Sequence, residues 1–213
     1  MHRYDPGRQR LALGLAFLAG QVDATGFVVA GGYFTSFMSG NTTRLGVDLA
    51  TAPELALLPL TIIACFVGGV TLGAMIAVRY AGRHKRILLG VVTLLLGAAG
   101  LALHLSRDIL FMALAAAAMG ISNNVFSRDG EVTVGVTYMT GALVRSGQGL
   151  AAWLLGRPNI AMRGYASLWL ALALGAVGGA MLHARAPDIA ASLPFALAGM
   201  LFLCALRIEG RAA

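Results

Sequence analysis

Long apolar segments constrain the fold of this chain more than any other feature of its sequence. We place six of them, at about residues 11–33, 55–78, 87–105, 109–126, 165–182 and 189–206. A helix of about 20 apolar residues crosses the ~30 Å hydrocarbon core of a bilayer. Only 12% of the residues are charged, whereas a soluble domain has roughly 25%. The sequence therefore predicts an all-α, polytopic helical membrane protein in which residues 1–213 form a single integral membrane domain.

A motif of fourteen residues occurs twice, at 37–50 and again at 138–151. Aligned without gaps at an offset of 101, the two copies share six identical positions, where chance gives about one. The copies read Phe37-Met-Ser-Gly-Asn-Thr-Thr-Arg-Leu-Gly-Val-Asp-Leu-Ala50 and Tyr138-Met-Thr-Gly-Ala-Leu-Val-Arg-Ser-Gly-Gln-Gly-Leu-Ala151. We interpret them as one duplicated unit, with repeat one at about 11–105 and repeat two at about 109–207. Because each repeat holds three spans, an odd number, the second enters the membrane from the opposite side, which predicts two inverted repeats.

The distribution of basic residues predicts the orientation. With both termini on one side of the membrane, the segments on that side carry 11 Lys and Arg residues and the loops on the other side carry 2. The positive-inside rule places the basic side in the cytoplasm. We therefore predict a multi-pass protein of the bacterial inner membrane with cytoplasmic N- and C-termini. The basic residues of the cytoplasmic side are Arg3, Arg8, Arg10, Arg79, Arg83, Lys85, Arg86, Arg157, Arg163, Arg207 and Arg211, and those of the outer loops are Arg107 and Arg185.

The two motif segments, 35–50 and 137–155, are too polar or too short to be ordinary spans. They could cross the membrane, re-enter it, or lie at its interface. We favour re-entrant or broken helices, because Ser-Gly-Asn and Thr-Gly sequences at membrane depth are tolerated where the backbone lines a cavity.

Asp23 is the one acidic residue in the middle of a predicted span. A carboxylate at the bilayer centre costs roughly 3 kcal/mol even on the translocon scale, so it must be paired, protonated or next to water. One interpretation is a site that exchanges a proton or cation during transport, and the other is a structural hydrogen bond to a neighbouring helix. At the motif offset, Asp23 aligns with Asn124, so we expect these two side chains to approach each other.

Arg44 and Arg145 occupy the same position in the two copies of the motif. Two guanidinium groups facing one cavity would suit an anionic ligand, since the planar fork matches carboxylate and phosphate. The alternative is that each side chain reaches its own membrane interface or caps a helix.

The remaining polar candidates surround the motif. Those in or beside the two copies could place backbone amides at a half-helix start, where anions bind readily. Simple helix capping and interhelical hydrogen bonds are the alternative interpretation. These candidates are Ser39, Asn41, Thr42, Asn123, Asn124 and Thr140.

Three stretches of the chain carry a resemblance to a known family: Gly20-Gln-Val-Asp-Ala-Thr-Gly26, Phe37-Met-Ser-Gly-Asn-Thr43 and Tyr138-Met-Thr-Gly-Ala-Leu143. In these the chain resembles the YoaK-like family, bacterial inner-membrane proteins grouped under a domain of unknown function. The resemblance implies a six-span integral membrane protein without a settled activity. One departure is Gly120-Ile-Ser-Asn-Asn124, where family members tend to read Gly-x-Gln-Asn-Ala.

The sequence favours a transporter or permease-like protein for a small solute, with an anion as one candidate class. The alternative is a non-transporting membrane protein such as an assembly factor or a sensor. We do not expect an enzyme, a metal site or a cofactor, because the chain has no HExxH, P-loop or zinc-ligand spacing. The net charge of +7 flanks the apolar spans rather than forming one stripe, so nucleic acid is not an expected partner. The lipid bilayer is the expected partner, and a homodimer is an assembly that the sequence allows.

Overall fold

The computed structural model describes residues 5–128, 131–157 and 161–210. Within these ranges the chain forms eight α-helices and one short β-hairpin, so the predicted helical architecture is confirmed. The helices are α1 (Pro6–Val29), α2 (Met38–Thr51), α3 (Leu57–Arg79), α4 (His84–His104), α5 (Asp108–Ser122), α6 (Met139–Leu154), α7 (Ala161–Arg185) and α8 (Pro187–Gly210). A 3-10 turn, η1 (Pro53–Leu55), precedes α3, and strands β1 (Ser127–Arg128) and β2 (Glu131–Val132) follow α5.

Five helices in the described part of the chain are long and apolar enough to cross a membrane. They are α1, α3 with the preceding η1, α4, α7 and α8. The fourth predicted segment, 109–126, is helical only as far as Ser122, because turns follow at 123–126, and α5 is therefore 15 residues long. The first predicted segment also ends early, at Val29 rather than Tyr33, because Gly31 and Gly32 adopt left-handed conformations with φ of +65° and +108°.

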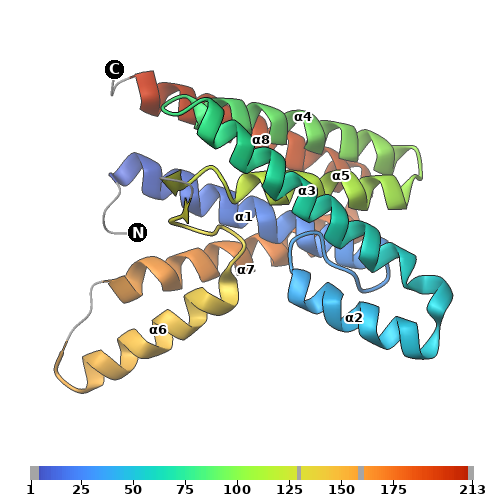
Figure 1. Cartoon of the computed structure of the whole chain (residues 1–213), viewed down its shortest axis with the longest axis horizontal. Coiled ribbons are helices and arrows are strands. Elements are labelled where there is room, and N and C mark those ends of the chain that lie inside the picture. Colours follow the sequence, from blue (N-terminus) through green and yellow to red (C-terminus); the bar gives the residue numbers. More distant parts are fainter. Residues whose placement is uncertain (1–4, 129–130, 158–160, 211–213) are drawn as a thin grey trace.

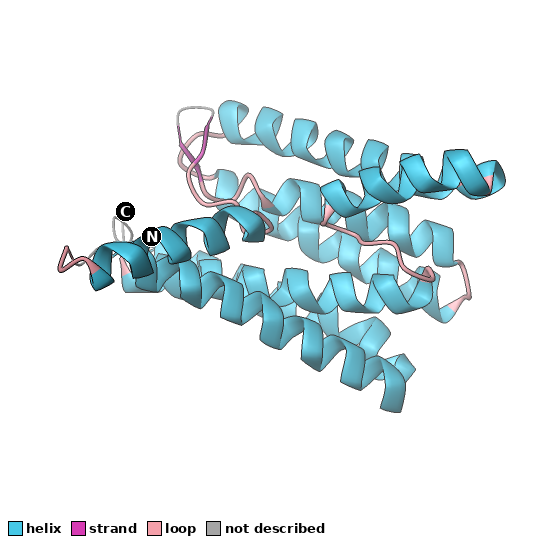
Figure 2. Ribbon diagram, turned by 90° about the horizontal axis from the view of Figure 1, so that it is seen from below, coloured by secondary structure: helices cyan, strands magenta, loops and turns pink. Residues whose placement is uncertain are grey.

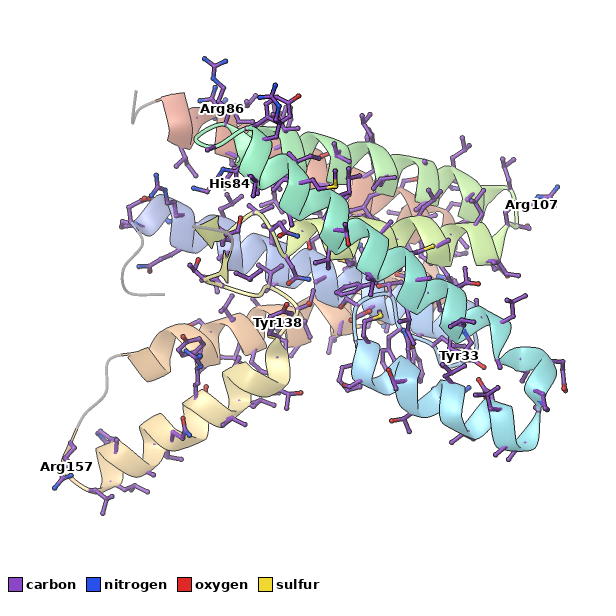
Figure 3. All side chains as sticks on the ribbon, viewed as in Figure 1. Tyr33, His84, Arg86, Arg107, Tyr138 and Arg157 are labelled. Atoms are coloured by element: carbon purple, nitrogen blue, oxygen red, sulfur yellow. The ribbon has the colours of Figure 1, made fainter. Side chains whose placement is uncertain are left out.

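The long helices lie side by side along one direction, as Figures 1 and 2 show. The start of α1, the turn between α3 and α4, and the end of α8 lie at one end of the molecule (Figure 1). The four basic residues labelled in Figure 3 follow the same division. His84, Arg86 and Arg157 lie toward that end, and Arg107 lies at the opposite end (Figure 3). Arg3 and Arg211, which belong to the predicted cytoplasmic set, lie outside the described residues.

Two helix pairs, α1 with α7 and α3 with α5, make the closest approaches in the structure. A Cβ atom built on Gly175 of α7 would lie 2.0 Å from the carbonyl oxygen of Phe17, and one built on Gly20 of α1 would lie 2.0 Å from that of Leu172. Only glycine allows the backbones to come this close, and such contacts drive helix association in lipid.

The pair α3 with α5 repeats this crossing. A Cβ atom on Gly69 of α3 would lie 2.2 Å from the carbonyl oxygen of Ala117, and one on Gly120 of α5 would lie 2.2 Å from that of Phe66. The sequences Gly69-x-x-x-Gly73 of α3 and Gly175-x-x-x-Gly179 of α7 are therefore packing faces. The structural offset between α1 and α5 is 100, since Gly20 corresponds to Gly120.

Helices α2 and α6, which hold the two motif copies, differ from the others in length and place. They contain 14 and 16 residues, and each begins near the middle of the molecule (Figure 1). From there α2 runs outward to one end and α6 to the opposite end. The two helix N-termini thus meet near the centre.

Candidate functional site

A cavity of about 310 Å³ lies where the N-termini of α2 and α6 meet. Tyr138, just before α6, is placed near the centre of the molecule in Figure 3. Phe66 of α3 contributes from a long helix, and the two copies of the motif, each with the residue just before it, supply the rest of the lining. The lining residues are Ser36, Phe37, Met38, Ser39, Phe66, Thr137, Tyr138, Met139, Thr140 and Gly141.

The two copies of the motif contribute matching side chains to this cavity. At the motif offset of 101, a serine corresponds to a threonine twice, methionine to methionine, and phenylalanine to tyrosine. The lining therefore combines hydroxyl side chains with aromatic and methionine side chains. The matched pairs are Ser36 with Thr137, Phe37 with Tyr138, Met38 with Met139, and Ser39 with Thr140.

Backbone amides at the two helix starts add hydrogen-bond donors to the lining. Neither α2 nor α6 has a side chain that caps its N-terminus. The Met38 and Met139 amides donate to the carbonyls of Ser36 and Thr137, and Asn41 and Ala142 are the first to bond one turn back, to Phe37 and Tyr138. The amides between them, at 39–40 and 140–141, have no acceptor within the helix. Two uncapped helix N-termini with their partial positive charge thus face a shared cavity.

Asp23 of α1 fixes the turn that leads into α2. Its Oδ1 accepts hydrogen bonds from the backbone N–H of Thr35 (2.8 Å), the Thr35 hydroxyl (2.8 Å) and the backbone N–H of Ser36 (2.7 Å). Its Oδ2 accepts one from the Ser36 hydroxyl at 2.6 Å. Four hydrogen-bond donors converge on this one carboxylate and tie the segment before α2 to helix α1. This favours the interpretation of Asp23 as a structural hydrogen-bond acceptor.

Asn123, rather than Asn124, holds the residue before the second copy of the motif, as Asp23 does before the first copy. Its Nδ2 donates to the Thr137 hydroxyl at 3.0 Å, and its Oδ1 accepts from that hydroxyl at 3.2 Å and from the Thr137 backbone N–H at 3.4 Å. Asn124 instead donates to the carbonyl of Val70 on α3 at 3.1 Å. The predicted correspondence of Asp23 with Asn124 is therefore wrong by one residue.

Asn41 and Thr42 serve the local structure of the motif. Asn41 is buried, accepts a hydrogen bond from the Phe34 backbone N–H (2.9 Å) and donates to the Phe34 carbonyl (2.7 Å). This pair of bonds holds the chain before α2. The Thr42 hydroxyl donates to the Met38 carbonyl one turn back, at 2.8 Å. Among the predicted polar residues, Ser39 and Thr140 line the cavity, whereas Asn41 and Thr42 do not.

Arg44 and Arg145 do not line the cavity. The Arg44 guanidinium lies over the Tyr33 ring, 4.7 Å from its centre, and donates to the Gly31 carbonyl at 3.2 Å. The Arg145 guanidinium lies over the Tyr165 ring of α7 at 4.9 Å and donates to its hydroxyl. The prediction that the two arginines share this central cavity is wrong, because each is held by a cation–π contact to a tyrosine away from it.

The structure adds residues that the sequence did not single out. Ser36 and Thr137 line the cavity, and each stands directly before one copy of the motif. A hydroxyl residue at the same position before both copies is the sequence signal that could have identified them. Tyr33 and Asp48 form a second buried group, in which the phenol donates to Asp48 Oδ2 at 2.7 Å. Burial raises the pKa of the Tyr33 phenol, and the hydrogen bond to Asp48 and its negative charge raise it further.

No group of three or more His, Cys, Asp or Glu residues is placed to hold a metal ion within the described ranges.

Comparisons with known proteins agree with this architecture. Residues 11–206 match the family described as "Protein of unknown function (DUF1275)". The chain is 37% identical over 211 residues to a UPF0700 transmembrane protein of Rhizobium meliloti (strain 1021). The aligned region covers 96% of this chain and 91% of that protein. No solved structure matches. The resemblance to an uncharacterised family of membrane proteins is thus confirmed, and the chain is a transmembrane protein that belongs to the DUF1275 family.

Proposed function

We propose that this protein is a permease for a small solute, which binds in the cavity between the N-termini of α2 and α6. The matched lining supplied by both copies of the motif is the observation that carries the proposal. Transporters built from inverted repeats place their substrate site at the repeat interface, between half-helix N-termini. In this proposal α2 and α6 are re-entrant half-helices, and α1–α4 and α5–α8 are the inverted repeats. The repeated α1–α7 and α3–α5 crossings support that division.

An anion is the favoured class of solute. The cavity offers hydroxyl and backbone N–H donors, and the two helix N-termini both favour negative charge. None of the residues that line it is charged. Asp23 lies directly behind Ser36, and its carboxylate opposes a highly charged ligand. The proposed solute is therefore small and singly charged, and no catalytic residue or cofactor takes part.

The first experiment is a thermal-shift screen of the purified protein against a library of small anions and neutral metabolites. A bound solute at a hundredfold excess over its Kd stabilises the protein by about 2.7 kcal/mol. We expect stabilisation by a singly charged anion. If no solute stabilises the protein, and a protein partner co-purifies with it instead, the assembly-factor or sensor alternative replaces the permease.

Removing one cavity hydroxyl should weaken solute binding by roughly ten- to a hundredfold. Ser39→Ala or Thr140→Val deletes one donor, and a hydrogen bond to a charged group contributes roughly 1.5–3 kcal/mol. Thr42→Val is the matched control. The Thr42 hydroxyl lies on α2, like that of Ser39, but it donates to the Met38 carbonyl and does not line the cavity. Binding measured by calorimetry should weaken in the first two variants only. Equal weakening in the control would remove the cavity as the binding site.

The proposed orientation has both termini in the cytoplasm. In a variant whose native cysteines, Cys65 and Cys204, are replaced by alanine, His84→Cys should react with a membrane-impermeant thiol reagent only after the cells are opened. Arg107→Cys, at the opposite end of the molecule, should react in spheroplasts that are still sealed. The reverse pattern would invert the orientation.

A further inference from the structure

The two copies of the motif supply matched residues to the central cavity, but the residues that hold them from behind differ in charge. Ser36 and Thr137 are the matched pair directly before each copy, and both line the cavity. The Ser36 hydroxyl is held by the carboxylate of Asp23, whereas the Thr137 hydroxyl is held by the amide of Asn123. The two hydroxyls therefore offer different hydrogen-bonding roles to a ligand.

The Ser36 hydroxyl can serve a ligand only as an acceptor. It donates its one hydrogen to Asp23 Oδ2 at 2.6 Å. An ionised carboxylate accepts hydrogen bonds and cannot donate them, so this hydrogen is committed, while a lone pair of the hydroxyl oxygen remains. A ligand group next to Ser36 must therefore bring an O–H or N–H of its own.

The Thr137 hydroxyl can serve a ligand as a donor. Its oxygen receives a hydrogen bond from Asn123 Nδ2 at 3.0 Å. Its own hydrogen lies within reach of Asn123 Oδ1 at 3.2 Å, an acceptor that it shares with the Thr137 backbone N–H. A carboxylate in the cavity is a stronger acceptor than this amide oxygen. The second copy also has Tyr138, with a phenol donor, where the first has Phe37.

The rest of the lining suits an apolar body. Three aromatic side chains and two thioethers contribute to it, and methionine adapts to the shape of the group it packs against. Ligand pockets of roughly 300–1,000 Å³ hold organic molecules of drug size, so a cavity of about 310 Å³ exceeds what a small inorganic anion fills. The apolar lining consists of Phe37, Met38, Phe66, Tyr138 and Met139.

We propose that the solute of this cavity is an organic monocarboxylate with an apolar body and a hydroxyl group at the end remote from the carboxylate. The carboxylate accepts hydrogen bonds from Thr137 and Tyr138, and the solute hydroxyl donates to Ser36. The apolar body lies against Phe66 and the two methionines. This assignment rests on the proposed function, which makes the cavity a solute site, and adds the chemical class and the direction in which the solute lies.

Binding of three probes to the purified protein in lipid nanodiscs tests the proposal by calorimetry. The probes are 4-hydroxybenzoate, 4-methylbenzoate, which has the same shape without the donor, and nitrate. We expect 4-hydroxybenzoate to bind roughly tenfold or more tighter than 4-methylbenzoate, because a site built to bond a hydroxyl rejects the analogue that lacks it. Nitrate should bind most weakly. Equal affinity for the two benzoates, tighter binding of nitrate, or no binding of any probe overturns the proposal.

Two variants separate the two ends of the solute. Ser36→Ala should abolish the preference for 4-hydroxybenzoate over 4-methylbenzoate, and three of the four donors to Asp23 remain in that variant. Thr137→Val should weaken both benzoates equally, by roughly ten- to a hundredfold, because it removes a donor to the carboxylate. Thr42→Val should change neither quantity. A preference that survives in Ser36→Ala refutes the assigned direction.

Exchanging the two residues behind the cavity gives a rescue test. Asn123→Asp should abolish benzoate binding, because the Thr137 hydroxyl then donates to the new carboxylate. Adding Asp23→Asn should restore binding and the preference for 4-hydroxybenzoate, since the hydrogen-bonding roles of Ser36 and Thr137 are then reversed together. A double variant that folds as the parent does but binds no better than Asn123→Asp contradicts the proposal.

Uptake into proteoliposomes distinguishes this proposal from the permease function. If 4-hydroxybenzoate binds with the expected preference but is not taken up, the permease is refuted and the assignment of the ligand stands. If nitrate or another solute is taken up while 4-hydroxybenzoate neither binds nor competes, the permease stands and the assignment of the ligand is wrong.

Discussion

Gly175→Ala should destabilise the protein by roughly 1–3 kcal/mol, the range typical of overpacking in a well-packed interior. The new Cβ atom would lie 2.0 Å from the Phe17 carbonyl oxygen, which belongs to the backbone of α1 and cannot rotate away. Helices α1 and α7 must therefore separate or tilt. Gly175→Leu should enlarge the effect until no monodisperse protein is recovered in detergent.

The control for this substitution lies on the same helix. A Cβ atom on Gly178 meets no atom within 4 Å, so Gly178→Ala should change the stability by less than about 0.5 kcal/mol. Gly69→Ala and Gly68→Ala form a second matched pair on α3, where only Gly69 contacts a backbone, at Ala117. Thermal unfolding in a mild detergent measures all four variants. Equal shifts for Gly175→Ala and Gly178→Ala would show that the close crossing is not required.

Asp23→Ala should be the most damaging single substitution near the cavity. It leaves four donors, two on Thr35 and two on Ser36, without their acceptor in a buried site. Each unsatisfied buried donor costs about 1–3 kcal/mol, so a loss on the order of 3 kcal/mol or more is expected. Asp23→Asn should cost less, because Asn123 holds the turn before the second copy of the motif with an amide.

Glu54→Ala provides the control, since it removes an acidic side chain that is exposed on η1. Chemical denaturation in mixed micelles, followed by tryptophan fluorescence, compares the three variants. If Asp23→Ala is as stable as Glu54→Ala, the Asp23 carboxylate does not hold the turn before α2. Its presence in α1 would then have to be explained by a different role.

The sequence predicts the helices of this fold well and their ends less well. Length and apolarity are enough to locate a span, and the glycine spacing at Gly69 and Gly175 identifies the packing faces. The apolar runs continue past Val29 and Ser122, however, because hydropathy does not register a turn. In the first case the signal was the Gly31-Gly32 pair, whose left-handed backbone ends the helix.

The candidate site could be predicted only in part, because an alignment without gaps hides small shifts. The motif copies are 101 residues apart, but the helices before them are offset by 100, so Asp23 corresponds to Asn123. The paired arginines were misleading for another reason. Arg44 and Arg145 are identical in both copies, yet their tyrosine partners, Tyr33 and Tyr165, come from non-equivalent parts of the chain. A repeated residue therefore does not establish a repeated contact.

The crossing of α1 with α7 also constrains how the protein is made. The glycine face of α1 has its partner near the end of the chain, whereas α5 finds its partner, α3, already synthesised. During synthesis α1 must wait in the membrane, with Gly20 uncovered, until α7 emerges from the ribosome. Contacts this distant in sequence form slowly. A chain truncated before α7 therefore leaves the glycine face of α1 uncovered, and we expect the first half of the chain alone to be degraded rather than to form a stable half-protein.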